Sequence, residues 1–332
     1  MTFIDRGYPH VQILVTGATG HIGRHVCRQL AEAGHRVHAL ALPGTSVPEF
    51  EHPNIKPFSG ATSVPESVAV ALEGCSTIIH AAGVKNASRD STFVRRNVKG
   101  TTALTTLAAQ FKIEHFIFVS SLAAQGPSAP GVPHVSARGE APLGAYGRSQ
   151  LQAESAIQNS RIAGQCTILR PAIVYGPHDP DLLQWARLAK RRVLPFRPDL
   201  ELSFVHVFDL ARLIVKLTET GRPIPGPHFI SDGQIQTMEA VVDQLERALD
   251  SGPSLRILLS ERLMKPMTSP LQKLTAASGL LSGFSQLIAD MNATGWACTA
   301  ESARKRLDFE PAIDFPNGFR DTIRWYKAQG LV

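Results

Sequence analysis

The sequence predicts an α/β fold, a doubly wound parallel sheet with a smaller mixed C-terminal region. Short apolar runs alternate with helix-length amphipathic stretches through the first half of the 332 residues. This alternation is typical of repeated strand–helix–strand units around a parallel sheet. Three glycines follow the first apolar run, and from about Gly176 the alternation gives way to proline-rich loops. The loops mark the start of a second region.

Five apolar runs are predicted as strands of the parallel sheet. Each is short and almost continuously apolar, as expected for strands that are buried on both faces. They are VQILVT (11–16), RVHALA (36–41), STIIHAA (76–82), HFIFVSS (115–121) and CTILRPAIV (166–174).

Helices are predicted between the strands, where apolar residues recur with helical spacing. The first three are HIGRHVCRQLAEAG (21–34), PESVAVALEG (65–74) and TFVRRNVKGTTALTTLAAQ (92–110). The first two end at a glycine, which suits the left-handed residue that closes a helix. Two later helices are predicted at AYGRSQLQAE (145–154) and VFDLARLIVKLTET (207–220).

The loop ILVTGATGHIG places Gly17, Gly20 and Gly23 directly after a strand and at the start of a helix. In a dinucleotide-binding (Rossmann) loop the first glycine makes a tight turn, and the second lets the backbone approach a pyrophosphate. The third lets the helix pack on the strand, and the helix N-terminus faces the anion. The spacing therefore predicts dinucleotide binding.

The domain organisation follows from these elements. We predict a dinucleotide-binding Rossmann domain at 1–176, with a return at about 205–248, and a substrate-binding region at 177–204 and 249–332. The last third contains an amphipathic stretch, TSPLQKLTAASGLLSGFSQLIAD (268–290). This stretch either packs on the core or at a dimer seam, or forms a wall or lid over an apolar substrate.

Composition argues against several other classes of protein. No run approaches the roughly 18 apolar residues of a membrane span, and MTFIDRGYPH lacks the order of a secretory signal. The four cysteines are widely spaced, without a C-x-x-C pair, so neither disulfides nor a metal site is expected. The net charge is +6, but the basic residues form short separate clusters without interleaved aromatics. We expect a cytoplasmic protein that binds neither nucleic acid nor membranes.

Several motifs, in order, resemble the extended short-chain dehydrogenases/reductases, the NAD-dependent epimerase/dehydratase family. They are the glycine loop, HAAG (80–83), RRNVKGT (95–101), FVSS (118–121), the helix that carries Tyr146, LRPAIVYGP (169–177) and FVHVFDLA (204–211). The resemblance covers nearly the whole chain. It implies an enzyme with NAD or NADP as cofactor, a small-molecule substrate and a homodimeric assembly.

The resemblance also implies roles for individual residues. Tyr146 matches the general acid/base, Ser121 the hydroxyl that hydrogen-bonds the substrate oxygen, and Asn97 a supporting asparagine. Gln150 stands at the position of a lysine that binds the nicotinamide ribose. The cofactor would contact Tyr146, Gln150 and the following residues: Gly17, Thr19, Gly20, His21, Ile22, Gly23, Ala81, Ala82, Gly83, Val119, Pro171, Ile173 and Val174.

Gln150 departs from the family pattern. The family's lysine lowers the pKa of the catalytic phenol; at about 4 Å and an effective dielectric of about 20, such a charge is worth roughly 4 kcal/mol. Its loss would slow phenolate-dependent chemistry on the order of a thousandfold. Gln150 can still donate a hydrogen bond to a ribose hydroxyl. Arg148 is expected to point away from Tyr146, and Lys85 and Lys99 are the candidate replacements for the missing cation.

Two further departures concern the adenosine end of the cofactor site. After the second strand the family carries an acid for NAD or an arginine for NADP, and this chain has Ala41 and Leu42. Gly60–Ala61 replaces the family's Gly-Asp pair. The choice between NAD and NADP therefore stays open, with Thr45, Ser46 and Arg24 as candidate ligands of a 2′-phosphate.

Three polar residues near these motifs have structural explanations. His80 ends a predicted buried strand and is expected to be a hydrogen-bonded core residue. Asp209 precedes a helical run and is expected to be its N-cap. His206, just before it, is expected to be structural.

The residues leave more than one function open. The first is an NAD(P)-dependent oxidoreductase that transfers a hydride at a hydroxyl or carbonyl of a small, apolar metabolite. The second is a degenerate family member that acts as a non-redox binding or assembly subunit, or as a redox-neutral catalyst. The third is a nucleotide-sugar epimerase/dehydratase. An introduced Lys-to-Gln change would explain Gln150 but neither alanine.

Overall fold

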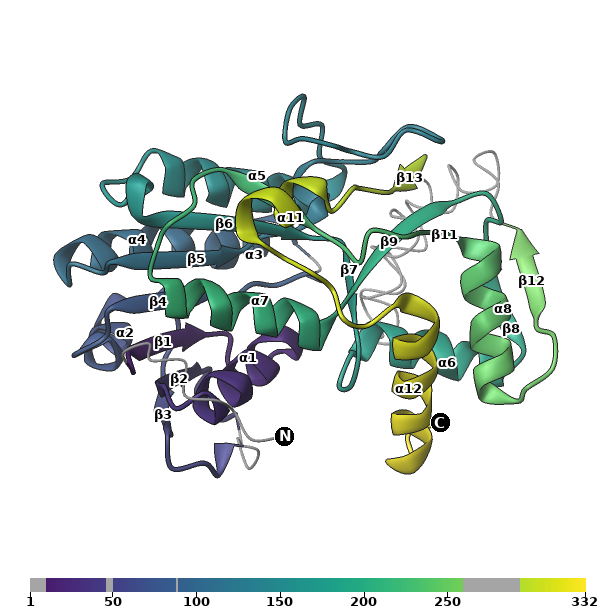
Figure 1. Cartoon of the computed structure of the whole chain (residues 1–332), viewed down its shortest axis with the longest axis horizontal. Helices are drawn as coiled ribbons and strands as arrows, with labels where there is room; N and C mark the ends of the chain where they lie inside the picture. The colour runs from purple at the N-terminus through teal and green to yellow at the C-terminus, as the bar shows by residue number, and fades with distance from the viewer. Residues whose placement is uncertain (1–9, 46–49, 88, 259–292) are drawn as a thin grey trace.

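A seven-stranded parallel sheet forms the centre of the protein (Figure 1). The computed structural model describes residues 10–45, 50–87, 89–258 and 293–332. The strand order is β10-β6-β5-β4-β1-β2-β3, so the chain reverses direction across the sheet after β3. The strands are β1 (Gln12–Thr16), β2 (Arg36–Ala41), β3 (Ile55–Ser59), β4 (Thr77–His80), β5 (His115–Val119), β6 (Cys166–Pro171) and β10 (Pro227–Ile230). The predicted doubly wound fold is confirmed.

Helices cover both faces of this sheet, and alternate residues of each strand point to opposite faces. Ile13 and Val15 of β1 pack in a core with α1 (His21–Glu32), α7 (Val207–Thr220) and α11 (Glu301–Leu307). Leu14 packs in a second core with α2 (Pro65–Leu72), α4 (Gly100–Gln110) and α5 (Gly144–Gln158). Burial on both faces explains why the strands are almost continuously apolar.

Three local features differ from the pattern expected from hydropathy. β3 is absent from the predicted strands because Lys56 and Pro57 make it polar and largely exposed. The run 166–174 is two strands, since β7 (Ile173–Tyr175) leaves the main sheet after Pro171 and pairs with β9 (Glu201–His206). The long helix at 92–110 contains a π-helical segment, η2 (Val94–Lys99), between α3 (Asp90–Phe93) and α4.

The remaining elements form a smaller region beside the carboxyl ends of the strands (Figure 1). Its sheets are β11-β9-β13, with β7 beside β9, and the pair β12-β8. The new elements are α6 (Pro180–Lys190), β8 (Val193–Phe196), β11 (Ile235–Thr237), α8 (Met238–Leu249), β12 (Leu255–Leu258), β13 (Gly295–Trp296) and α12 (Phe315–Ala328). Residues 268–290, predicted as a wall, lid or seam, lie outside the described residues.

A separate hydrophobic core holds this region together. α6, α8 and α12 contribute to it, together with β9. α8 therefore packs with the other elements of the smaller region, whereas α11, which comes later in the sequence, packs on the main sheet. The division into two sequence regions stays a prediction.

A buried guanidinium connects the strand ends to α5. Arg170 of β6 is 1 % exposed and donates to both carboxylate oxygens of Glu154, with Nη2 at 2.6 Å from Oε2. Its Nη1 donates to Oε1 of Gln125 at 2.7 Å, and Glu154 also accepts a hydrogen bond from Ser120. Ser120 directly precedes Ser121, and Glu154 lies on α5. This network holds β5, β6 and α5 together.

Replacing Glu154 by glutamine should destabilise the fold strongly. The substitution removes the closest counter-charge of a fully buried guanidinium, and such a loss costs about 3–5 kcal/mol. Urea unfolding followed by circular dichroism measures it. Glu32→Gln, which breaks the exposed Arg28–Glu32 pair, is the control and should cost about 0.5 kcal/mol or less. Equal losses in the two variants would contradict this account of the network.

Candidate active site

The glycine loop after β1 requires glycine at two positions for steric reasons. Gly17 has φ +69°, and a Cβ there would lie 2.7 Å from the carbonyl oxygen of Ala81 and from the backbone of Ala82. A Cβ on Gly23 would lie 2.1 Å from the carbonyl oxygen of Gly17. Gly20 is exposed, and its N–H donates to that same oxygen at 2.9 Å. The loop is thus pressed against the end of β4 and against its own helix.

The N-terminus of α1 lacks a side-chain cap. Gly20 is the N-cap residue and offers no side-chain acceptor. By contrast, Asp179 caps α6, Thr237 caps α8 and Asp314 caps α12. Unpaired amides at a helix start, behind a glycine turn, form a site for an anion. This cradle fits the diphosphate of a dinucleotide.

Tyr146 lies in the first turn of α5, and Gln150 stands one turn after it. The Gln150 Nε2 donates to the Tyr146 hydroxyl at 3.1 Å, and Gln150 is 6 % exposed. Since the phenol oxygen accepts this bond, its own proton is available to another acceptor. Arg148 points away, as expected, and its guanidinium lies 3.8 Å from exposed Asp90.

Asn97 connects α5 to the loop after β4. It lies in the π-helical segment η2, a geometry that is common at functional sites. Its Oδ1 accepts from the Val84 N–H at 2.8 Å, and its Nδ2 donates to the Val84 carbonyl and to Ser149 Oγ. Ser149 Oγ in turn donates to the Tyr146 carbonyl at 2.7 Å. Asn97 supports the tyrosine helix without lining the cleft.

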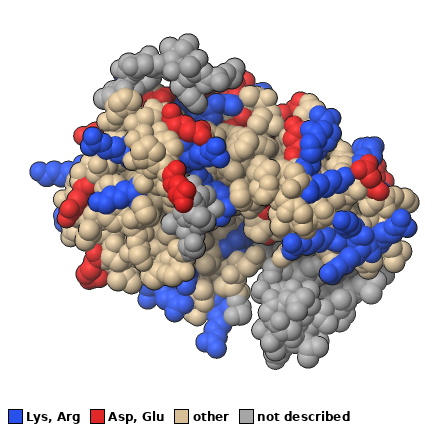
Figure 2. All heavy atoms as spheres, turned by 90° about the horizontal axis from the view of Figure 1, so that it is seen from below, with Lys and Arg blue, Asp and Glu red and all other residues tan. Residues whose placement is uncertain are grey.

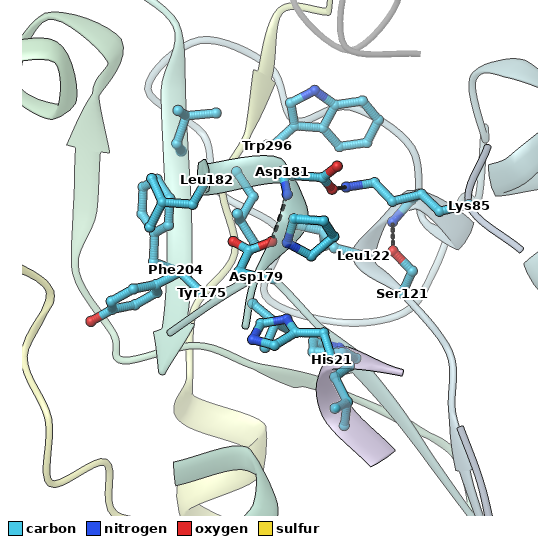
Figure 3. Close-up of a pocket in the computed structure, with 18 of the residues that line it drawn as sticks. His21, Lys85, Ser121, Leu122, Tyr175, Asp179, Asp181, Leu182, Phe204 and Trp296 are labelled. Atoms are coloured by element: carbon cyan, nitrogen blue, oxygen red, sulfur yellow. Dashed lines mark hydrogen bonds and ion pairs between the residues drawn. The ribbon is translucent and has the colours of Figure 1, made fainter. Parts of the chain in front are cut away.

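A cleft of about 440 Å³ opens at the carboxyl ends of the strands. In Figure 3, Tyr175 and Phe204 lie on one side of it, and Ser121 and Lys85 on the other. Ser121 Oγ accepts from the Ala123 N–H at 3.1 Å. The predicted site residues that line the cleft are Gly20, His21, Ile22, Gly23, Ala81, Gly83, Ser121, Tyr146, Pro171, Ile173 and Val174.

Six predicted site residues are not part of this lining. Gly17 and Thr19 belong to the glycine loop, Ala82 follows β4, and Val119 is buried at the end of β5. Gln150 contacts the lining residue Tyr146, and Asn97 bonds to Val84, which lies between the lining residues Gly83 and Lys85.

Apolar residues from the smaller region form the rest of the lining, and sequence patterns did not single them out. They are contributed by β9, α6, α8, β13 and α12, far along the chain from the glycine loop. Seven of them are Leu182, Trp185, Leu202, Phe204, Val241, Trp296 and Phe319. Helical spacing along α8 and alternation along β9 are the only signals for such positions, and both also indicate ordinary core residues.

Charged groups are few in the described lining, and they include Lys85, Asp179 and Asp181. Lys85 Nζ is 2.6 Å from Oδ2 of Asp181, so the candidate cation is already in an ion pair. Burial and the neighbouring Asp181 raise the pKa of Asp179 to about 7. Burial and the neighbouring His25 lower the pKa of His21 to about 3, so its imidazole is uncharged at neutral pH. Lys99 is exposed and does not line the cleft.

The adenosine end keeps its apolar character in the structure. Ala41 is buried at the end of β2, and Leu42 is 47 % exposed. Ala61 N–H donates to Ser67 Oγ at 3.1 Å. Arg24 donates to the Thr19 carbonyl at 2.9 Å. Ser46 lies outside the described residues.

Two structural expectations hold and one is wrong. His80 is fully buried between Thr16 and Thr101, both within hydrogen-bond distance, and burial lowers its pKa to about 3. His206 has a structural role, because its Nδ1 accepts from the Phe208 N–H and caps α7. Asp209 is therefore not the N-cap. It is buried in the first turn of the helix, where its Oδ2 accepts hydrogen bonds from the backbone N–H groups of Ala312 and Ile313.

Lys and Arg side chains lie in separate groups on the face shown in Figure 2, in several places beside Asp and Glu. Several of the basic side chains form ion pairs, for example Arg256 with Asp243 and Lys327 with Asp250. In the described part of the chain, no helix is long and apolar enough to cross a membrane. The described residues also contain no group of three or more His, Cys, Asp or Glu side chains that is arranged to hold a metal ion.

The chain was compared with known proteins. Residues 13–230 match the model of the NAD dependent epimerase/dehydratase family. A ceramide reductase of Caulobacter vibrioides is 29 % identical over 330 residues, which cover 96 % of each chain. A 2-alkyl-3-oxoalkanoate reductase of Stenotrophomonas maltophilia is 26 % identical, with 93 % of this chain and 98 % of the relative covered. The fold is shared with the Bordetella bronchiseptica enzyme WbmG, whose crystal structure is in complex with NAD and UDP. The TM-score is 0.79 and the sequence identity 17 %, with 99 % of this chain and 98 % of that chain covered.

Gly23→Ala should weaken the binding of NADH and NADPH by on the order of tenfold or more. The added methyl group meets the Gly17 carbonyl, so the loop must move away from the start of α1. Fluorescence titration of the reduced dinucleotide measures the affinity, and circular dichroism verifies folding. Gly164→Ala is the control, because a Cβ at Gly164 meets nothing within 4 Å. A folded Gly23→Ala variant with unchanged affinity for both dinucleotides would contradict the assignment of the cradle.

The ionisation of Asp179 should lower stability as pH rises. Its folded-state pKa of about 7 lies above the ordinary value of 3.8. The stability from its protonated form is therefore fully present below about pH 4 and is lost as pH rises through 7. Asp179→Asn keeps a side chain that can cap α6. In this variant the free energy of unfolding, measured with urea at each pH, should no longer decline over this range. Asp199→Asn, at an exposed aspartate, is the control and should keep the decline. If the decline persists in Asp179→Asn, Asp179 is not the group whose ionisation lowers the stability.

Proposed function

The chain belongs to the NAD-dependent epimerase/dehydratase family, enzymes whose cofactor is a nicotinamide dinucleotide, and we propose that it is an NAD(P)-dependent oxidoreductase acting on a small, apolar metabolite. Hydride transfer would take place at a carbonyl or hydroxyl carbon of that substrate. One observation carries the proposal: Ser121 and Tyr146 line the same cleft as the glycine loop, and the rest of that cleft is mostly apolar.

The cofactor would lie across the carboxyl ends of the strands. The glycine turn and the start of α1 would hold its diphosphate, and Pro171, Ile173 and Val174 would line its nicotinamide end. When bound, the dinucleotide supplies or accepts the hydride. The protein's part is to place the substrate carbon, exclude water and move the proton of the substrate oxygen.

Ser121 and Tyr146 would handle that oxygen. The Ser121 hydroxyl would donate a hydrogen bond to the substrate carbonyl and orient it. The Tyr146 hydroxyl would give its proton to the oxygen as the carbonyl is reduced, or take it up in the reverse reaction. Gln150 already donates to the phenol oxygen, which leaves the phenol's proton directed to the substrate. Asn97 would act as a positioning residue through Ser149 and the loop after β4.

The charges of the site favour this function over a nucleotide-sugar epimerase/dehydratase. A nucleotide sugar brings a second diphosphate, which proteins hold with cations or helix N-termini. In the described lining the one lysine is paired with Asp181 and His21 is neutral. The names of the two reductase relatives, whose substrates are lipid-like, agree with the apolar cleft. The epimerase function remains the second candidate because the family includes it.

A degenerate, non-redox protein is the remaining alternative. Gln150, Ala41 and Ala61 motivate it, and the intact pair of Ser121 and Tyr146 opposes it. Titration with NADH and NADPH separates the alternatives. Micromolar binding of either, with oxidation of that cofactor in the presence of an aliphatic ketone, supports the oxidoreductase. Binding of neither, in folded protein, would refute it, and turnover of UDP-glucose alone would favour the epimerase.

Gln150→Lys should raise turnover by up to about a thousandfold at neutral pH, since a cation beside the phenol favours its ionised form. The rate of alcohol oxidation should also level off at a lower pH. Steady-state kinetics across pH measure both effects. Gln152→Lys adds the same charge on the exposed side of α5 and should change neither. With a verified substrate, a Gln150→Lys enzyme no faster than the unmodified protein would show that the amide is not what limits the reaction.

We also propose a homodimer in the cytoplasm. The family resemblance supports the dimer, which sedimentation velocity tests. The four cysteines are free and buried in the structure, which is the state expected in a reducing compartment.

A further inference from the structure

We propose that the cleft contains a binding site for one unbranched aliphatic chain, formed by β9 and α8. The inference rests on the proposed function, because the carbonyl attached to this chain would face Ser121 and Tyr146. It names the substrate class that the proposed function leaves open, a straight-chain aliphatic ketone or the corresponding alcohol.

Two elements supply the long walls of the chain site. On α8, Met238, Val241 and Leu245 line the cleft with spacings of three and four residues, so they form a single stripe along the helix. On β9, Leu202 and Phe204 are alternate residues and point to the same side of the strand. The helix stripe and the strand face thus give the cleft two apolar walls.

The dimensions of this space favour a slender ligand. Met238 to Leu245 spans about 10 Å along the helix axis at 1.5 Å per residue. The whole cleft, with the end at Ser121 and Tyr146 included, measures about 440 Å³, near the low end of the roughly 300–1,000 Å³ of ligand pockets. Met238 also has a flexible side chain that adapts to a chain's conformation.

The walls from β9 and α8 offer no polar side chain for a hydrogen bond. Every lining residue that β9, α8, β13 and α12 contribute is apolar, and Leu245 and Phe319 are each 1 % exposed. A sugar hydroxyl or an amide placed there would lose its water without gaining a partner. Methylene groups lose nothing by leaving water, and their burial is favourable. The polar residues of the lining come from outside these two walls, among them Lys85 from the loop after β4, and Asp181 and Gln184 from α6.

Affinity for straight-chain 2-alkanones should therefore rise about fourfold with each added methylene. The rise should stop at a cut-off, the chain length that fills the site. Calorimetric titration of the protein with a series of increasing chain length measures this without any turnover. Trp185 and Trp296 line the cleft, so tryptophan fluorescence gives a second readout. Leu245→Trp should shorten the cut-off, whereas Arg247→Trp, on the exposed side of the same helix, should leave it unchanged. Leu245→Ala should lengthen it.

The outcomes separate this inference from the proposed function. Length-dependent binding without oxidation of NADH or NADPH would support the chain site and refute the oxidoreductase. Turnover of ketones with affinity independent of chain length would refute the chain site and keep the oxidoreductase. Equal affinity for cyclic ketones with the same number of carbons would also overturn it, because a fused or cyclic body would then fit as well. If Leu245→Trp fails to fold, an unchanged cut-off in Leu245→Ala would decide against the chain site.

Discussion

The site depends on parallel strands that end at one edge of the sheet. β1 leads into the glycine loop, β4 into residues 81–83, β5 into Ser120 and Ser121, and β6 ends at Pro171. Adjacent strands in parallel register bring these four ends together although up to about 150 residues separate them in sequence. At the β1–β4 junction the backbones are so close that Gly17 leaves no room for a Cβ. The cradle for a dinucleotide follows from that contact.

Polar groups behind the lining fix the reacting residues on this frame. Arg170 and Glu154 connect β6 to α5, and Ser120 joins them beside Ser121. Asn97 connects α5 to the loop after β4 through Ser149. Both networks are buried and well paired, so the helix that carries Tyr146 is held from two sides. A proton-transfer group needs such support, because small displacements reduce its rate strongly.

The amide at Gln150 gives the site its particular character. An ammonium group there would supply both a hydrogen bond and a positive field, and the amide keeps only the hydrogen bond. Lys85 does not replace the field, since it forms an ion pair with Asp181. The cleft is therefore poor in positive charge and rich in apolar surface, which suits a neutral, hydrophobic substrate better than a phosphorylated one.

The sequence by itself determined the doubly wound sheet, the glycine loop and the tyrosine helix. These features depend on local patterns: apolar periodicity, the need for glycine at crowded turns, and short motifs in a fixed order. The tertiary structure decided which residues line the cleft beyond those motifs. Trp296 lines the same cleft as the glycine loop only because the smaller region packs against the strand ends. Core residues such as Leu245 look alike in sequence whether or not they face a cavity. The tertiary structure also decided that His206 rather than Asp209 caps α7, because the Asp209 carboxylate accepts hydrogen bonds from the backbone amides of residues 312 and 313. Contacts between distant segments carry no local signal, so sequence patterns could not predict them.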